Sequence, residues 1–90
     1  MSDPARCAEA DILRYLLAHQ NARDTLEGIE MWWLPRERPY GRAEIEEALR
    51  VLEARELVRV WQSASAQPIF GQGADREALQ ERLEGLEKRH

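Results

Sequence analysis

The sequence is poor in the residues on which catalysis and metal binding depend. Its 90 residues include one cysteine, two histidines and one phenylalanine. The lone Cys7 cannot form a disulfide within the chain, and Cys7 with His19 leaves a zinc site two ligands short. Two histidines and scattered glutamates supply no Ser-His-Asp arrangement, phosphate-binding loop or paired acidic site. We therefore expect no enzyme, no metal site and no cofactor.

Long apolar runs are also missing. No stretch approaches the roughly 20 apolar residues that a membrane-spanning helix requires. Residues 1–6 contain neither the basic nor the apolar region of a signal peptide. A single cysteine without an export signal suits a reducing compartment. We expect a cytoplasmic protein that makes no contact with a membrane.

Positive charge is the scarcer sign. Thirteen Lys and Arg stand against seventeen Asp and Glu, a net charge of −4. The balance is −3 over residues 1–30, zero over 31–60 and −1 over 61–90. Proteins that bind nucleic acid usually carry a basic surface, so any such surface is expected in the central third.

Helical periodicity dominates the front of the chain. Asp3 before Pro4 is typical of a helix start, and the first helix is predicted over residues 8–19. A second helix is predicted from Asp24 as N-cap, with Glu27 reaching back to it, and Pro35 ends it. Their apolar faces consist of Ala8, Ile12, Leu13, Leu16 and Leu17 in the first helix and Leu26, Ile29 and Trp33 in the second. Because adjacent helical residues point about 100° apart, one of Trp32 and Trp33 is expected to be buried and the other at an edge or interface.

The stretch over residues 40–72 changes period and predicts a helix followed by a hairpin. Four apolar residues at helical spacing, Ile45, Ala48, Leu49 and Leu52, predict a helix over 42–55. Residues 57–61 are β-branched and aromatic, which indicates a strand, and Ile69 with Phe70 restarts an apolar run. Trp61 is expected to pack beneath the last helix, with an exposed surface for a partner as the alternative. The fold class is therefore mainly α with a small β-hairpin (α+β).

A last helix is predicted over residues 76–89, with Asp75 as its cap. Its leucines form a narrow seam, Leu79, Leu83 and Leu86. A helix of about 15 residues is marginal alone in water, so it must dock on its own domain or pair with another chain. We predict that it helps to form a homodimer, with residues 1–73 as one domain and 74–90 as the docking or dimerisation helix.

Residues 8–72 resemble the winged helix-turn-helix domain of small bacterial transcriptional regulators. The resemblance rests on residues 24–29, similar to the start of that fold's second helix, and on the apolar pattern Leu49, Leu52, Leu57 and Val58. It implies that 42–55 is a recognition helix for the major groove of double-stranded DNA and that 57–72 is the wing. The implied function is DNA binding and regulation of transcription.

Candidate DNA contacts follow from these positions. They are Arg36, Arg38, Arg42, Arg50, Arg59, Gln62 and Gln67. Arg42 is the candidate for a base edge, because bidentate Arg to guanine is the commonest specific contact. The others are expected on phosphates.

Other features favour a second interpretation, a winged-helix module that binds protein and not DNA. Glu56 stands where the family usually has glycine in a left-handed conformation. The loop over residues 35–41 is longer than the family's turn. Glu44, Glu46 and Glu47 crowd the start of the third helix, where they suit the helix dipole but would face phosphates in DNA. The acidic balance of the whole chain points the same way.

Overall fold

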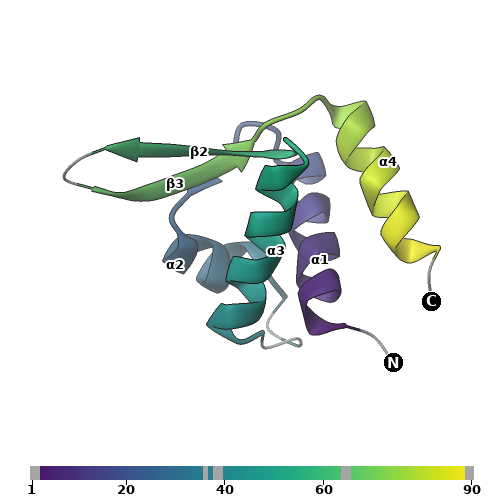
Figure 1. The fold of residues 1–90 in the computed structure, drawn as a ribbon, viewed down its shortest axis with the longest axis horizontal. Coiled ribbons are helices and arrows are strands. Elements are labelled where there is room, and N and C mark those ends of the chain that lie inside the picture. Colours follow the sequence, from purple (N-terminus) through teal and green to yellow (C-terminus); the bar gives the residue numbers. More distant parts are fainter. Residues whose placement is uncertain (1–2, 36, 38–39, 64–65, 89–90) are drawn as a thin grey trace.

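The computed structural model describes residues 3–35, 37, 40–63 and 66–88, and it combines helices with an antiparallel sheet (Figure 1). The elements are α1 (Pro4–Ala18), β1 (Arg23–Asp24), α2 (Leu26–Gly28), the π-helical turn η1 (Ile29–Trp33), α3 (Arg42–Ala54), β2 (Val58–Ser63), β3 (Ala66–Gln72) and α4 (Arg76–Glu87). The α+β class expected from the sequence is confirmed. Among the described residues, no helix has both the length and the apolar character needed to cross a membrane.

The sheet has three strands in the order β1-β3-β2, and both pairings are antiparallel. The hairpin of β2 and β3 projects away from the helices (Figure 1). Strand β1 was not expected from the sequence. Its two residues, Arg23 and Asp24, pair with Gly71 and Phe70 of β3, and two residues are too few to show a period.

Helix caps explain where the helices start. Asp3 accepts a hydrogen bond from the N–H of Ala5, at 2.9 Å, and Asp75 accepts one from Ala78, also at 2.9 Å, as the sequence predicts. The predicted cap of the second helix was wrong by one residue. Thr25 accepts from the N–H of Gly28, whereas Asp24 belongs to β1.

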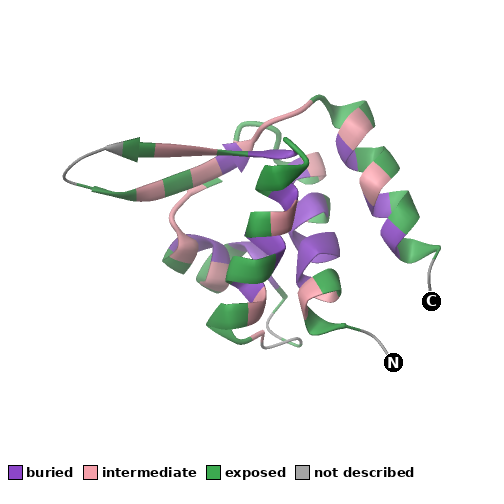
Figure 2. Cartoon of the chain, in the orientation of Figure 1, coloured by how far each residue is buried: buried purple, intermediate pink, exposed green. Residues whose placement is uncertain are grey.

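The core lies where α1, α3 and η1 meet beneath the sheet, and Figure 2 shows their buried faces turned toward one another. The apolar face predicted for α3 is buried and consists of Ile45, Ala48, Leu49 and Leu52. Trp33 is buried, whereas Trp32 is 65% exposed, so the expected split between the two tryptophans is confirmed. Trp33 stacks on Tyr15 of α1 with 4.8 Å between ring centroids.

Helix α4 docks on α1 of its own chain. Its leucines, Leu79, Leu83 and Leu86, are all buried in the common core. The Glu9 side chain on α1, 3% exposed, accepts two hydrogen bonds from Arg82, from Nε at 2.5 Å and from Nη2 at 3.1 Å. Near the other end of the contact, Arg14 of α1 pairs with Glu87 at 2.8 Å, and this hydrogen bond raises the pKa of the Arg14 guanidinium.

The chain leaves α3 through a left-handed residue. Glu56 has φ of 62°, the conformation for which glycine was expected at this place. The N–H of Leu57 donates to the carbonyl of Leu52 at 2.9 Å, which closes the end of the helix. A side chain in this conformation costs roughly 1–2 kcal/mol, so the turn is formed at a cost in stability.

Candidate functional site

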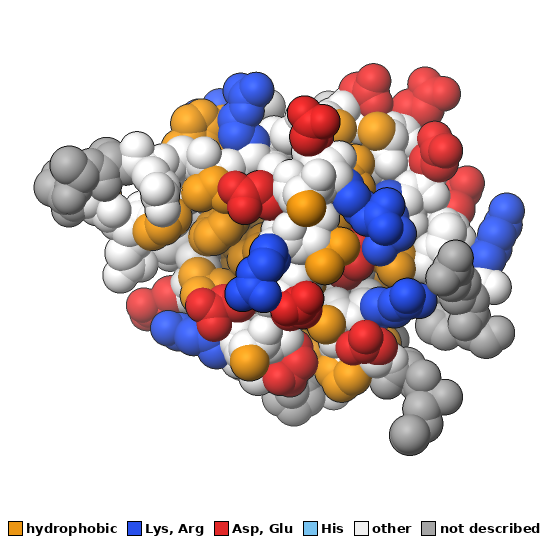
Figure 3. Space-filling model, in the orientation of Figure 1, with side chains coloured by type: hydrophobic (Ala, Val, Ile, Leu, Met, Phe, Trp, Pro, Cys, Tyr) orange, Lys and Arg blue, Asp and Glu red, His pale blue; other side chains and the backbone are white. Residues whose placement is uncertain are grey.

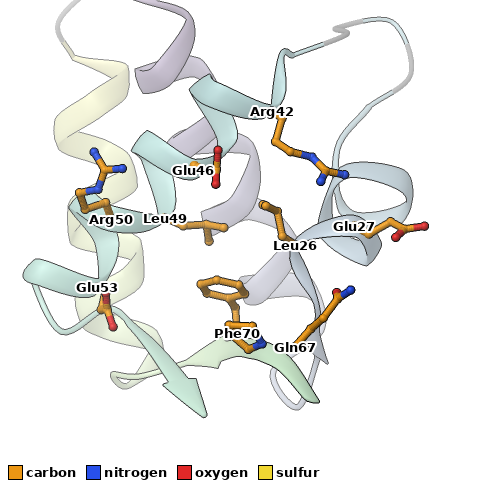
Figure 4. Close-up of a pocket in the computed structure, with 10 residues that line it drawn as sticks. Leu26, Glu27, Arg42, Glu46, Leu49, Arg50, Glu53, Gln67 and Phe70 are labelled. Carbon is orange, nitrogen blue, oxygen red and sulfur yellow. The ribbon is translucent and has the colours of Figure 1, made fainter. Parts of the chain in front are cut away.

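A groove of about 460 Å³ separates α3 from β3 and α2. It is lined by Leu26, Glu27, Arg42, Glu46, Leu49, Arg50, Glu53, Gln67, Pro68 and Phe70. Figure 4 shows Leu26, Leu49 and Phe70 pointing toward one another from three different elements. We name this surface the α3–β3 groove.

The floor of the groove is apolar because the elements around it turn their core-facing sides toward it. Leu49 belongs to the buried face of α3, and Leu26 and Phe70 pack against the core from α2 and β3. Pro68 extends the apolar surface along β3. Hydrophobic side chains gather in the hollow between hairpin and helices in Figure 3.

The rim of the groove carries an excess of negative charge. Arg42 is held by Glu30 of η1 at 3.3 Å, and Arg50 is held by Glu47 of α3 at 2.9 Å. The remaining rim carboxylates, on Glu27, Glu46 and Glu53, make no ion pair within the part of the chain that the structure describes. Five glutamates thus surround two arginines.

Glu44 has a different role from its neighbours. Its carboxylate accepts a hydrogen bond from the N–H of Gly41 at 2.8 Å and so closes the start of α3. Of the three glutamates that crowd this start, Glu46 and Glu47 are therefore the ones exposed to a ligand.

The residues predicted for DNA contact do not all come together. Arg42, Arg50 and Gln67 line the α3–β3 groove, and Gln62 is exposed on β2. Arg59 also lies on β2 but lines a second pocket, across the sheet from α3. Arg36 and Arg38 lie outside the described residues.

The residues predicted for dimerisation are covered by their own chain. Leu79, Leu83 and Leu86 pack on α1 within the core, so they form no exposed seam. Of the two alternatives that the sequence leaves for this helix, docking on its own domain is the one observed. A homodimer built through these leucines would require α4 to exchange between chains.

An exposed apolar pair on η1 was only half anticipated. Met31 is 53% exposed and Trp32 65% exposed, both on η1. The sequence indicated an edge or interface position for one tryptophan, but nothing marked Met31, because a π-helical turn shifts the faces of a helix. Within the described residues, no group of three or more His, Cys, Asp or Glu is placed to hold a metal.

Comparisons with known proteins identify no relative of this chain. No protein-family model, no curated protein and no solved structure matches this chain. Its function therefore has to be argued from the α3–β3 groove and the surfaces around it.

Proposed function

We propose that this chain is a winged-helix module that binds a protein partner in the α3–β3 groove. The winged-helix assignment is supported by the order of α1, β1, α2, α3 and a terminal hairpin, and by the strand order β1-β3-β2. In this assignment α3 is the recognition helix and β2–β3 is the wing. The observation that carries the binding proposal is the chemistry of the groove, an apolar floor inside an acidic rim.

The floor distinguishes a protein partner from DNA. Leu26 and Phe70 are only partly buried, and a ligand that covers them gains about 25 cal/mol for each Å² of apolar surface removed from water. Leucine or isoleucine side chains of a peptide supply such surface. A phosphate backbone does not, and desolvating phosphates against this floor would cost free energy.

The rim selects the charge of the partner. Uncompensated carboxylates on Glu27, Glu46 and Glu53 attract Lys and Arg and repel phosphates or acidic segments. The two arginines of the groove add little positive field, because Glu30 and Glu47 already neutralise them. The partner class is therefore a basic amphipathic segment, with apolar residues toward the floor and Lys or Arg toward the rim.

The apolar pair on η1 extends this surface. Met31 and Trp32 follow Glu27 of the rim within five residues along α2 and η1. Trp and Met are enriched in protein interfaces, and exposed Trp is a frequent hot spot. Trp32 is therefore the expected anchor for the part of the partner that leaves the groove.

The experiment measures binding of two designed amphipathic peptides by fluorescence anisotropy. Both carry the same leucines at helical spacing, one with Lys and the other with Glu on the polar face. We expect the basic peptide to bind and the acidic peptide not to bind. Equal affinity for both, or none for either, would overturn the proposal.

Variants locate the peptide on the surface. Glu46→Gln with Glu53→Gln removes two rim charges, each worth about 0.2–1 kcal/mol in an exposed pair, so binding should weaken roughly two- to thirtyfold. Glu81→Gln with Glu84→Gln is the matched control, because it removes two exposed charges from α4. Trp32→Ala should reduce the binding free energy by more than about 1 kcal/mol.

DNA binding by a cytoplasmic, dimeric transcriptional regulator is the second candidate function. It is favoured by the place of α3 in the winged-helix arrangement and by the presence of Arg42, Arg50 and Gln67 on one side of it. If α3 enters the major groove, Glu46→Gln with Glu47→Gln should tighten binding, because phosphates then approach these positions. Arg42→Ala should cost about 1–3 kcal/mol on a preferred site. Unchanged affinity in both variants would remove α3 as the DNA-contacting helix.

A further inference from the structure

The outer face of the sheet, turned away from α3, carries two arginines in one row. Arg23 of β1 and Arg59 of β2 both stand opposite Gly71 of the central strand β3. Neighbouring strands lie about 4.8 Å apart, so the backbones of β1 and β2, on either side of β3, are about 9.6 Å apart. The two arginine side chains therefore flank the position of Gly71, which has no side chain of its own.

Trp61 fills that centre. A Cβ atom on Gly71 would lie 2.9 Å from Cζ3 of Trp61 and 3.1 Å from Cγ of Arg23, so the ring occupies the space that only glycine leaves open. The guanidinium carbon of Arg23 lies 4.4 Å from the ring centroid and that of Arg59 lies 6.0 Å from it. Both distances permit cation–π attraction, which holds the two groups toward one side of the sheet. The expectation that Trp61 packs beneath α4 is thus replaced by packing beneath Arg23.

Neither of these two arginines has a carboxylate partner within the described residues, in contrast to Arg42 and Arg50 of the groove. Arg6, Arg55 and Arg76 also form no ion pair there, but only Arg23 and Arg59 converge over one ring. A pocket of about 510 Å³ adjoins the row, and its lining includes the amides of Gln20, Asn21 and Gln72. Its one carboxylate, on Asp75, already accepts the N–H of Ala78. The two guanidinium groups over Trp61 therefore give this face uncompensated positive charge in a chain of net charge −4.

We propose that the outer face of the sheet binds the phosphate backbone of a nucleic acid, with Arg23 and Arg59 on two phosphates. A guanidinium presents a planar fork of donors that matches phosphate oxygens. Ile69, 38% exposed, stands opposite Trp61 on the same face and offers apolar surface to sugars or bases beside the phosphates. The sheet separates this surface from the acidic rim of the α3–β3 groove, so a bound strand avoids those carboxylates.

The experiment measures binding of a labelled DNA duplex of about 20 base pairs, which offers many more phosphates than the two that Arg23 and Arg59 would contact. With two phosphates neutralised, the slope of log affinity against log salt should be about −1.8 for a duplex. A rise from about 50 to about 200 mM salt should then weaken binding about 12-fold. Absence of binding at the lower salt would overturn the proposal.

Variants separate this face from α3. Arg23→Ala and Arg59→Ala should each weaken binding and bring the slope about 0.9 closer to zero, since each removes one phosphate contact. Arg50→Ala changes the net charge equally but lies on α3, so it should leave the slope unchanged. Circular dichroism melts confirm folding, and Arg23→Lys with Arg59→Lys retains the charge if the alanine variants unfold. If Arg50→Ala has the same effect as Arg23→Ala, the outer face is not the site.

Competition experiments determine whether the outer face prefers nucleic acid to other polyanions. Unlabelled oligonucleotide should displace the probe at concentrations at which a glutamate homopolymer of equal charge does not. Displacement by both alike would make this a site for any polyanion and overturn the nucleic-acid assignment. Because Arg23 and Arg59 lie outside the α3–β3 groove, their replacement should leave the basic amphipathic peptide bound, so this inference and the proposed function fail independently.

Discussion

Replacing Arg82 by methionine tests how α4 is held on the rest of the chain. The Glu9 carboxylate, only 3% exposed, receives both of its hydrogen bonds from the Arg82 guanidinium. Methionine retains much of the stem but leaves this carboxylate buried and uncompensated, which costs about 3–5 kcal/mol. Because the Arg82 side chain is 22% exposed, water reaches the site, and we expect the lower end, about 3 kcal/mol.

That loss is large for a domain of this size. At roughly 0.05–0.15 kcal/mol per residue, the whole free energy of unfolding is about 5–13 kcal/mol. A loss of about 3 kcal/mol should lower the Tm by about 12–24 °C. Denaturant and thermal melts followed by circular dichroism measure both quantities.

A second substitution separates the buried charge from the packing of α4. On the Arg82→Met background, Glu9→Met removes the uncompensated carboxylate, and the double variant should return to within about 1 kcal/mol of the wild type. Lys88→Ala is the control for loss of a cation at the end of α4, where Lys88 is the C-cap residue, and should stay within about 0.5 kcal/mol. A loss below 1 kcal/mol in Arg82→Met alone would refute the reasoning, because Glu9 would then not depend on Arg82.

Four further substitutions or measurements test other parts of the structure. Leu49→Ala should cost about 2–5 kcal/mol in denaturant melts, because it leaves a cavity in the buried face of α3; a loss below 1 kcal/mol would contradict this packing. Glu56→Gly should stabilise the chain by about 1 kcal/mol, since it relieves the left-handed conformation at φ of 62°, and a lower stability would show that the strain is absent. Thr25→Ala should cost about 0.5–2 kcal/mol through loss of the cap, with Thr25→Ser as the control that keeps the hydroxyl. Sedimentation of the intact chain tests the homodimer: a monomer at all concentrations would end that proposal, whereas a dimer that persists would require an exchanged α4.

Local sequence determined the helix ends that depend on nearby atoms. Asp3 and Asp75 cap helices through hydrogen bonds to N–H groups two and three residues away, so their role is visible in a short window. The apolar face of α3 and the following hairpin are likewise set by spacing within about ten residues. Glu56 adopts the left-handed turn because the helix and the next strand require it, even though glycine is absent.

Strand β1 and the place of the second cap required the folded chain. Arg23 and Asp24 become a strand only because β3, more than forty residues further on, offers its edge. Once Asp24 is drawn into the sheet, the cap moves to Thr25. Propensity alone could not decide this, because pairing partners distant in sequence compete with local hydrogen bonds.

Tertiary structure also decided which charges remain available to a ligand. The sequence marked Arg42, Arg50 and Arg59 as candidates for DNA contact. Folding brings Glu30 to Arg42, whereas Glu47 pairs with Arg50 three residues away on the same helix, and no carboxylate of the described residues pairs with Arg59. Arg82 likewise binds Glu9, 73 residues away in the sequence. The leucines of α4, which the sequence suggested for contact with a second chain, pack within their own chain instead. Electrostatic field and burial depend on distances between residues far apart in sequence, so spacing along the chain cannot predict them.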